Sequence, residues 1–259
     1  MNLAVSLGAR FCDETECGYP VVSDRLERVA SDIVACRQCP RLVRYRERVA
    51  RTKRLASREW VYWGRPVPGF GDPDARVLVV GLAPAAHGGN RTGRAFTGDR
   101  SGEFLYRALY RAGFASQPTS VSKDDGLVLR DCYIAAAVRC APPQNKPTRI
   151  EFARCQPYLE REVMLLRRLR VVVVLGAAAM QAFLRTWRAT GHDIPSPVPK
   201  FRHEGIWLLT PITLIASYHP SQRNTQTGRL TEPMFDRVFQ SVQAILPTHL
   251  RTSPRGTRN

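Results

Sequence analysis

The chain has 259 residues, of which 44% are hydrophobic, enough to bury a core without disulfides or a partner subunit. Lysine and arginine number 39 against 22 acidic residues, a formal net charge of +17. This excess predicts a polyanionic partner, nucleic acid ahead of an anionic membrane, with compositional bias of the genome as the alternative. No run approaches the roughly 20 apolar residues of a membrane span, and the acid-containing N-terminus is a poor secretory signal.

The two ends of the chain lack the strand and helix patterns of its middle. Residues 1–23 are predicted to be an irregular N-terminal segment and residues 247–259 a flexible basic tail, on either side of one domain over residues 24–246. Residues 51–74 are rich in proline and glycine and predict a surface loop that leads into the first strand.

Within the domain, four apolar runs predict buried strands, at residues 76–83, 133–138, 171–176 and 212–217. The runs do not alternate with polar residues, which is typical of parallel strands covered by helices on both faces. Helical patterns follow or separate them, at residues 102–112, 150–169, 177–187 and 235–246. Thr148 is the predicted cap of the second of these helices. The sequence therefore predicts an α/β fold, a three-layer α/β/α sandwich with a central four-stranded, mainly parallel sheet.

Seven cysteines, an odd number without a signal peptide, favour reduced thiols or metal ligands and a cytoplasmic protein. Four could form one site with four thiolates: Cys36, Cys39, Cys140 and Cys155. Cys36 and Cys39 form a C-x-x-C unit at which we expect one helix to end or another to begin. The spacing of the four cysteines alone favours zinc over a 4Fe–4S cluster, and four unrelated buried thiols are the alternative. We expect Cys12 and Cys17 to be free thiols in the N-terminal segment and Cys132 to be buried.

Two loops at the ends of predicted strands carry polar residues suited to chemistry. The loop from Gly81 to Gly102 combines glycines, arginines and one acid, Asp99, at an edge where open α/β sheets place ligands. Asp99 has an ordinary alternative role as a helix N-cap or an ion-pair partner of an arginine. His219 follows the last strand and precedes a proline and a polar loop, so it is the histidine that we expect in a site.

Three stretches resemble the uracil-DNA glycosylase superfamily, and within it the iron–sulfur type 5 branch found in bacteria and archaea. They are GLAPAAHGGNRTGRAFTGD from residue 81, VRCAPPQNKPT from residue 138 and SYHPSQRNTQTGRLT from residue 217. Together with the cysteine spacing, the resemblance covers about residues 28–246. It implies that the four cysteines named above hold a structural 4Fe–4S cluster, which reverses the preference for zinc and leaves zinc as the alternative.

The resemblance also implies the catalytic residues. Leu82 and Ala83 stand where the superfamily has a side chain that activates water, and neither can do so. Asp99 is implied as the replacement, and His219 matches the histidine that bonds the carbonyl of the base.

Base recognition is implied in the same way. Phe96 matches the aromatic ring that stacks on the extruded base. The base-reading asparagine of related branches falls within residues 135–137, which are all alanine here, and Asn145 is a candidate substitute. The implied base-binding set is Gly81, Ala83, Phe96 and Asn145.

The remaining polar residues of the two loops are expected to bind the DNA backbone or to wedge into the duplex. They are Arg91, Arg94, Arg100, Gln222, Arg223, Asn224 and Arg229. The resemblance thus implies a monomeric, nucleoid-associated DNA-repair glycosylase that flips its target base and leaves an abasic site. Because the usual asparagine is missing, we expect hypoxanthine, xanthine and ethenocytosine as substrates beside uracil. The alternatives are a metal-braced, non-enzymatic DNA-binding module and an iron–sulfur enzyme that acts on a small nucleotide.

Overall fold

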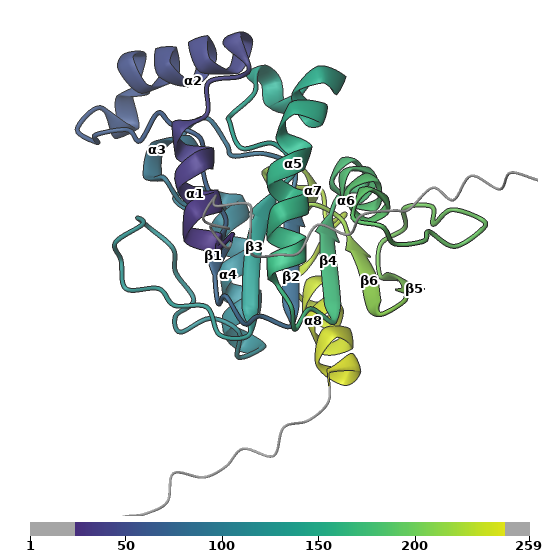
Figure 1. Cartoon of the computed structure of the whole chain (residues 1–259). Helices are drawn as coiled ribbons and strands as arrows, with labels where there is room; N and C mark the ends of the chain where they lie inside the picture. The colour runs from purple at the N-terminus through teal and green to yellow at the C-terminus, as the bar shows by residue number, and fades with distance from the viewer. Residues whose placement is uncertain (1–23, 247–259) are drawn as a thin grey trace, which may run out of the picture.

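The computed structural model describes residues 24–246, so the two predicted terminal segments, with Cys12 and Cys17, lie outside the described residues. The described chain forms a sheet between two layers of helices (Figure 1). The helices are α1 (Leu26–Ala35), α2 (Pro40–Thr52), α3 (Gly89–Thr92), α4 (Arg100–Arg111), α5 (Arg149–Leu165), α6 (Ala177–Ala189), α7 (Gln222–Gln226) and α8 (Glu232–Ile245), with single 3-10 turns at Leu55–Ser57 and Pro143–Asn145. The strands are β1 (Phe70–Gly71), β2 (Val77–Gly81), β3 (Cys132–Ala136), β4 (Val171–Leu175), β5 (Gly205–Leu209) and β6 (Ile212–Ser217).

The sheet has six strands in the order β1-β3-β2-β4-β6-β5. The four predicted strands are β2, β3, β4 and β6, and they run parallel. The expectation of four strands was wrong, because β1 and β5 pair antiparallel at the two edges. β1 is only two residues long, and Ile206 and Leu208 of β5 are exposed. β1 is too short to show an apolar run, whereas β5 (GIWLL) is apolar throughout and was missed although its run is continuous.

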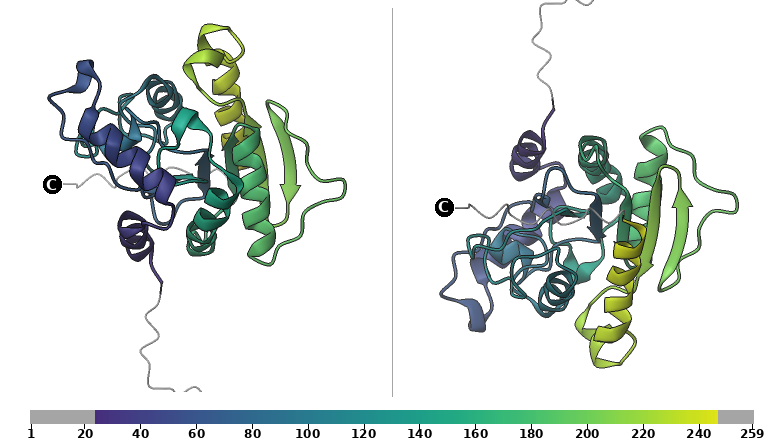
Figure 2. Two further views of the ribbon diagram at one scale, coloured as in Figure 1. Left: turned by 90° about the horizontal axis from the view of Figure 1, so that it is seen from above. Right: turned by 90° about the horizontal axis from the view of Figure 1, so that it is seen from below.

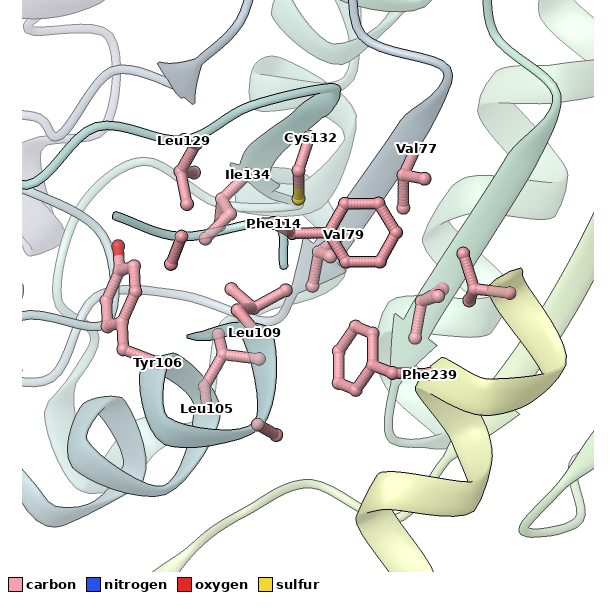
Figure 3. Close-up of a cluster of buried hydrophobic side chains, with 14 of the residues drawn as sticks. Val77, Val79, Leu105, Tyr106, Leu109, Phe114, Leu129, Cys132, Ile134 and Phe239 are labelled. Atoms are coloured by element: carbon pink, nitrogen blue, oxygen red, sulfur yellow. The ribbon is translucent and has the colours of Figure 1, made fainter. Parts of the chain in front are cut away.

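The three predicted layers are confirmed. Seen along the sheet edge, α4 and α8 lie on one side of the sheet. α5 and α6 lie on the other side, with α1 beside α5 (Figure 2). Side chains of β2 alternate between the two cores, since Val77 and Val79 join the α4–α8 side and Leu78 and Val80 the α5–α6 side. Figure 3 shows the first of these cores, where α4 and α8 meet the sheet.

Two predicted helix starts define the loops of the site. Thr148 caps α5 through a capping box with Glu151, as its position before the helical pattern indicated. Asp99 caps α4. Since β2, β3 and β6 are parallel, the loops that follow them meet at one edge of the sheet. No helix within residues 24–246 is long and apolar enough to cross a membrane.

Candidate active site and cysteine cavity

The loop between β2 and α4 ends on Asp99. The Asp99 carboxylate accepts a hydrogen bond from the backbone N–H of Gly102 at 2.9 Å, so the helix-cap role considered for it is real. The cap does not remove the carboxylate from the site. It fixes the carboxylate beside Gly88, where a Cβ atom on residue 88 would overlap it.

Burial dominates the electrostatics of Asp99. It raises the pKa of the carboxyl above its ordinary value, against the backbone N–H groups of Gly102 and Ser101, which favour the charged form. A carboxylate that is desolvated and yet held by helix N–H groups is a suitable base or water-positioning group, because its basicity is raised and its orientation is fixed.

Phe96 and His219 lie together at the ends of β2 and β6. Their ring centroids are 5.9 Å apart with an interplanar angle of 32°. Phe96 adopts a left-handed backbone conformation, with φ of 51°, and its ring lies over Gly81, where a Cβ atom would collide with it. Glycine at position 81 therefore allows the aromatic ring to reach the edge of the sheet beside the histidine.

The turn after β6 fixes His219. Its carbonyl accepts hydrogen bonds from the Ser221 N–H at 2.7 Å and from the side-chain amide of Asn224 at 2.8 Å. Burial lowers the pKa of the imidazole to about 4. His219 is therefore neutral at physiological pH and can donate a hydrogen bond from one ring nitrogen without being an imidazolium ion.

A cleft of about 460 Å³ opens beside Asp99. It brings together residues from four separate segments: Tyr45 of α2, Asp99, Asn145 in the turn after β3, and Gln222 of α7. Gln144 and Asn145 both have positive φ, near 55°, which turns this segment toward the cleft. A larger groove of about 860 Å³ between α1, α2 and residues 62–65 contains none of the predicted catalytic or base-binding residues. Ala83 and His219 are half-buried, and neither is among the residues that line the cleft.

Arg94 was expected to hold phosphate, and the structure corrects this. Its side chain is 3% exposed, and its guanidinium forms an ion pair with Asp125 at 2.7 Å and a hydrogen bond to Ser120 at 2.7 Å. A phosphate would have to break this buried pair, so Arg94 instead fastens the segment 116–128 onto the β2–α4 loop.

Arg91 is corrected in the same way, because it is buried and holds the loop from within. It donates to the carbonyls of His87 at 2.9 Å and Gly98 at 2.7 Å, and it stacks on Trp60 at 4.2 Å. Asn224 was expected to contact DNA, but its side-chain amide donates a hydrogen bond to the His219 carbonyl. The residues expected to bind DNA that are exposed at this edge are Arg100, Gln222, Arg223 and Arg229.

Sequence reasoning missed several residues at the cleft. The Tyr62 hydroxyl lies 3.0 Å from Nδ1 of His87, which lines the cleft beside Asp99. Tyr45 and Arg54 also line it. The His87 imidazole lies inside the motif loop and could have been found there, but Tyr45 and Arg54 come from a distant helix and turn whose approach no local pattern reveals.

The four singled-out cysteines line one small cavity. Cys36 ends α1 and Cys39 caps α2, so the predicted break between two helices is confirmed. Cys140 follows β3, and Cys155 lies on α5. Cys132 is buried away from this cavity, on β3.

The cavity is lined by cations as well as thiols. Arg46 is buried and donates to the Cys140 sulfur at 2.8 Å. Arg139 also lines the cavity, but its guanidinium forms an ion pair with buried Glu162. Burial raises the pKa of the Cys140 thiol to about 12 and that of Cys155 to about 11, so binding a metal here would release protons.

The donor set can be tested against the groups that four thiolates hold. Within residues 24–246, no three histidine, cysteine or acidic side chains converge closely enough to hold a metal ion. A single zinc ion needs its ligands at one point, whereas a cluster binds one thiolate on each of four irons. Four cysteines around one cavity, with buried Arg46 donating to one sulfur, fit a group that is held by four thiolates.

A basic α/β/α protein with a buried carboxylate, an aromatic ring and a neutral histidine at the carboxyl edge of its sheet has the features of a DNA base-excision enzyme. A family model of the uracil DNA glycosylase superfamily matches residues 68–243, and the chain belongs to this superfamily and is a hydrolase of N-glycosidic bonds.

Curated relatives place the chain in the type-5 branch of the superfamily. The type-5 uracil-DNA glycosylase of Thermus thermophilus is 49% identical over 225 residues, which cover 85% of this chain and 97% of that protein. The type-5 enzyme of Mycobacterium tuberculosis is 49% identical, with coverages of 82% and 79%, and that of Pyrobaculum aerophilum is 47% identical, with 82% and 89%. A type-4 enzyme from Sulfurisphaera tokodaii is 27% identical over 222 residues.

Proposed function

We propose that this protein removes uracil from DNA and also accepts hypoxanthine, xanthine and ethenocytosine. The observation that carries the proposal is the buried Asp99 carboxylate, fixed by α4 at a cleft that Asn145 also lines. The end of β3 supports the wider range, because Ala135, Ala136 and Ala137 are buried and offer no amide to select one base.

In this mechanism the target base leaves the helix before any bond breaks, because the duplex hides the glycosidic bond. Phe96 stacks on the extruded base, and Asn145 bonds its polar edge. Flipping costs a few kcal/mol, and least for mispaired bases such as those left by deamination. Part of the selectivity therefore comes from the DNA and not from the cleft.

Bond cleavage places negative charge on the leaving base and positive charge on the sugar. Neutral His219 donates a hydrogen bond to the base carbonyl as that charge grows, a contribution of roughly 3 kcal/mol by analogy with single oxyanion donors. The Asp99 carboxylate favours the cationic sugar and positions the water that attacks it. Among the described residues that line the cleft there is no lysine, which supports a monofunctional enzyme that leaves an abasic site.

We further propose that Cys36, Cys39, Cys140 and Cys155 hold a 4Fe–4S cluster. When bound, the cluster supplies structural cross-linking and no step of the base excision. Arg46 balances part of the negative charge of its thiolates, and the α1–α2 turn is held against β3 and α5.

A duplex panel tests the proposed activity. Duplexes with one uracil, hypoxanthine, xanthine or ethenocytosine are incubated with excess protein and then treated with hot alkali, which cuts at abasic sites. We expect strand cuts for uracil and for at least one further base, and none without the alkali step. No cut for any base would favour the non-enzymatic DNA-binding module.

A further inference from the structure

Helix α2 carries a row of arginines on one exposed face. Arg44, Arg48 and Arg51 recur at helical spacing, and Arg54 follows just beyond the helix end. Among residues 24–246, no acidic side chain forms an ion pair with any of these four. The Arg54 side chain donates to the Ser57 hydroxyl at 3.1 Å, and Arg48 lies over the Tyr45 ring at 5.5 Å. Because like charges at this spacing repel one another, an isolated helix would gain nothing from the row.

The other charged residues of α2 are used within the protein. Arg41 forms two hydrogen bonds with Glu151, at 2.8 and 2.7 Å, and Arg46 is buried on Cys140. Glu47, the one acid in α2, pairs with Arg37 at 2.7 Å. These contacts fix the helix on the body of the protein and leave the row of arginines unpaired and facing solvent.

The row of arginines on α2 lies next to the cleft of Asp99. Tyr45 lines the cleft of Asp99 and also lines, with Arg44, Arg48 and Arg51, a neighbouring hollow of about 420 Å³. Arg54 lines the cleft itself, and Gln222 of α7 lines it from a different segment. Figure 1 shows α2 across the end of the molecule where the loops of the site gather.

We propose that this row, Arg44, Arg48, Arg51 and Arg54, binds the DNA backbone on one flank of the flipped nucleotide. The inference rests on the proposed function and adds a second phosphate-binding surface beside the Arg223–Arg229 loop. From Arg44 to Arg51 the helix rises about 10 Å, roughly three steps of a DNA strand. Guanidinium groups suit phosphate because their planar N–H forks bond two oxygens at once.

Anionic lipid is a poorer match for the same charge. A helix that lies on a membrane inserts an apolar face, but the apolar side chains Leu42, Val43 and Val49 of α2 are buried against the protein. Only the basic face is offered to a partner, and it borders a cleft that must receive a nucleotide.

The test compares two triple variants with the same change of charge. R44A/R48A/R51A removes the three arginines of the row that lie on α2. R167A/R168A/R170A removes three exposed arginines just before β4, at the amino ends of the parallel strands and away from the site. Binding to a duplex with a non-cleavable abasic analogue is measured against salt concentration. We expect the slope of log affinity against log salt to fall by about 2.7 for the α2 variant, and to change far less for the control. Equal slopes for the two triple variants would overturn the proposal.

A second arm locates the contact. The duplex is shortened on one side of the abasic analogue and then on the other. Shortening the flank that α2 binds should lower the salt slope of the wild-type protein to that of the α2 variant. Shortening the other flank should not have this effect. An α2 variant that responds to both flanks as the wild-type protein does would count against the proposal. The single variants R44Q and R51Q, each expected to lower the slope by about 0.9, cover the case in which the triple variant fails to fold.

Failure of this inference is distinguishable from failure of the proposed function. If the wild-type protein cuts uracil duplexes but the α2 variant binds like the control, only the α2 surface is wrong. If the wild-type protein cuts none of the damaged duplexes, the proposed function fails whatever the slopes show.

Discussion

At the scale of single residues, Asp99 serves two purposes at once. It caps α4 and presents a desolvated carboxylate to the cleft. Asparagine can cap a helix as well as aspartate, so Asp99→Asn removes the charge and keeps the cap. We expect the variant to bind an abasic-analogue duplex normally and to lose most single-turnover cleavage. Cleavage at the wild-type rate would remove Asp99 from the mechanism.

The same substitution should stabilise the fold. Burial raises the pKa of Asp99 in the folded state, so ionisation above that pKa costs folding free energy that is absent when the group is protonated. At neutral pH Asp99→Asn should therefore melt at a higher temperature than the wild-type protein. The difference should shrink as the pH falls through the pKa of Asp99, and thermal melts at several pH values measure it.

The two catalytic groups also set the pH dependence of the rate. Asp99 acts as the carboxylate, so the single-turnover rate should fall as the pH drops through its raised pKa. His219 acts in the neutral form, and with a pKa of about 4 it does not titrate near pH 6.5. We expect one acidic limb, set by the raised pKa of Asp99, and a plateau above it. A limb near pH 6.5 that disappears in His219→Gln would show that an ordinary, protonatable histidine takes part.

At the scale of elements, the β2–α4 loop is braced from inside by arginines. Arg94 and Asp125 form a buried pair that also includes Ser120 and Thr97. Removal of one partner leaves the other charge buried without its counter-ion, which costs roughly 3–5 kcal/mol.

Arg94→Met should therefore lower the free energy of unfolding by about that amount, as measured by urea denaturation. Arg100→Met is the matched control, because Arg100 is exposed on the same loop, and it should leave the unfolding midpoint unchanged. Equal midpoints for the two variants would mean that the pair does not brace the loop.

At the scale of the whole molecule, the four cysteines connect segments that are far apart in sequence. The α1–α2 turn, the end of β3 and the middle of α5 meet at their cavity. A group bound there would close loops of more than a hundred residues and hold α2 near the cleft.

Loss of a cysteine ligand should therefore change both the absorbance spectrum and the stability of the protein. Cys140→Ser should lose broad visible absorbance and iron, and it should melt at a lower temperature. Cys132→Ala changes an equally buried cysteine outside the cavity and should keep the colour. A colourless wild-type protein that contains zinc would contradict the cluster.

The sequence by itself determined the elements that have local causes. Continuous apolar runs predicted the four parallel strands, and Thr148 before a helical pattern predicted the start of α5. The break at Cys36 and Cys39 was also visible, because a proline follows directly and is favoured at the first position of a helix. The edge strands were missed because β1 has only two residues and because only Thr210 and Pro211 separate the apolar run of β5 from that of β6.

Only the tertiary structure decided which of the polar side chains are free. Arg94 and Arg100 are six residues apart in one motif, and the first is buried because Asp125, 31 residues away, folds onto it. The same holds for the cleft, where Tyr45 and Asn145 approach Asp99 from distant parts of the chain. Hydrophobic periodicity is a property of neighbours in sequence, whereas the pairing of charges depends on neighbours in space. The sequence therefore determined the framework and the residue types of this DNA-repair hydrolase, and the fold decided which arginines brace the site and which remain for DNA.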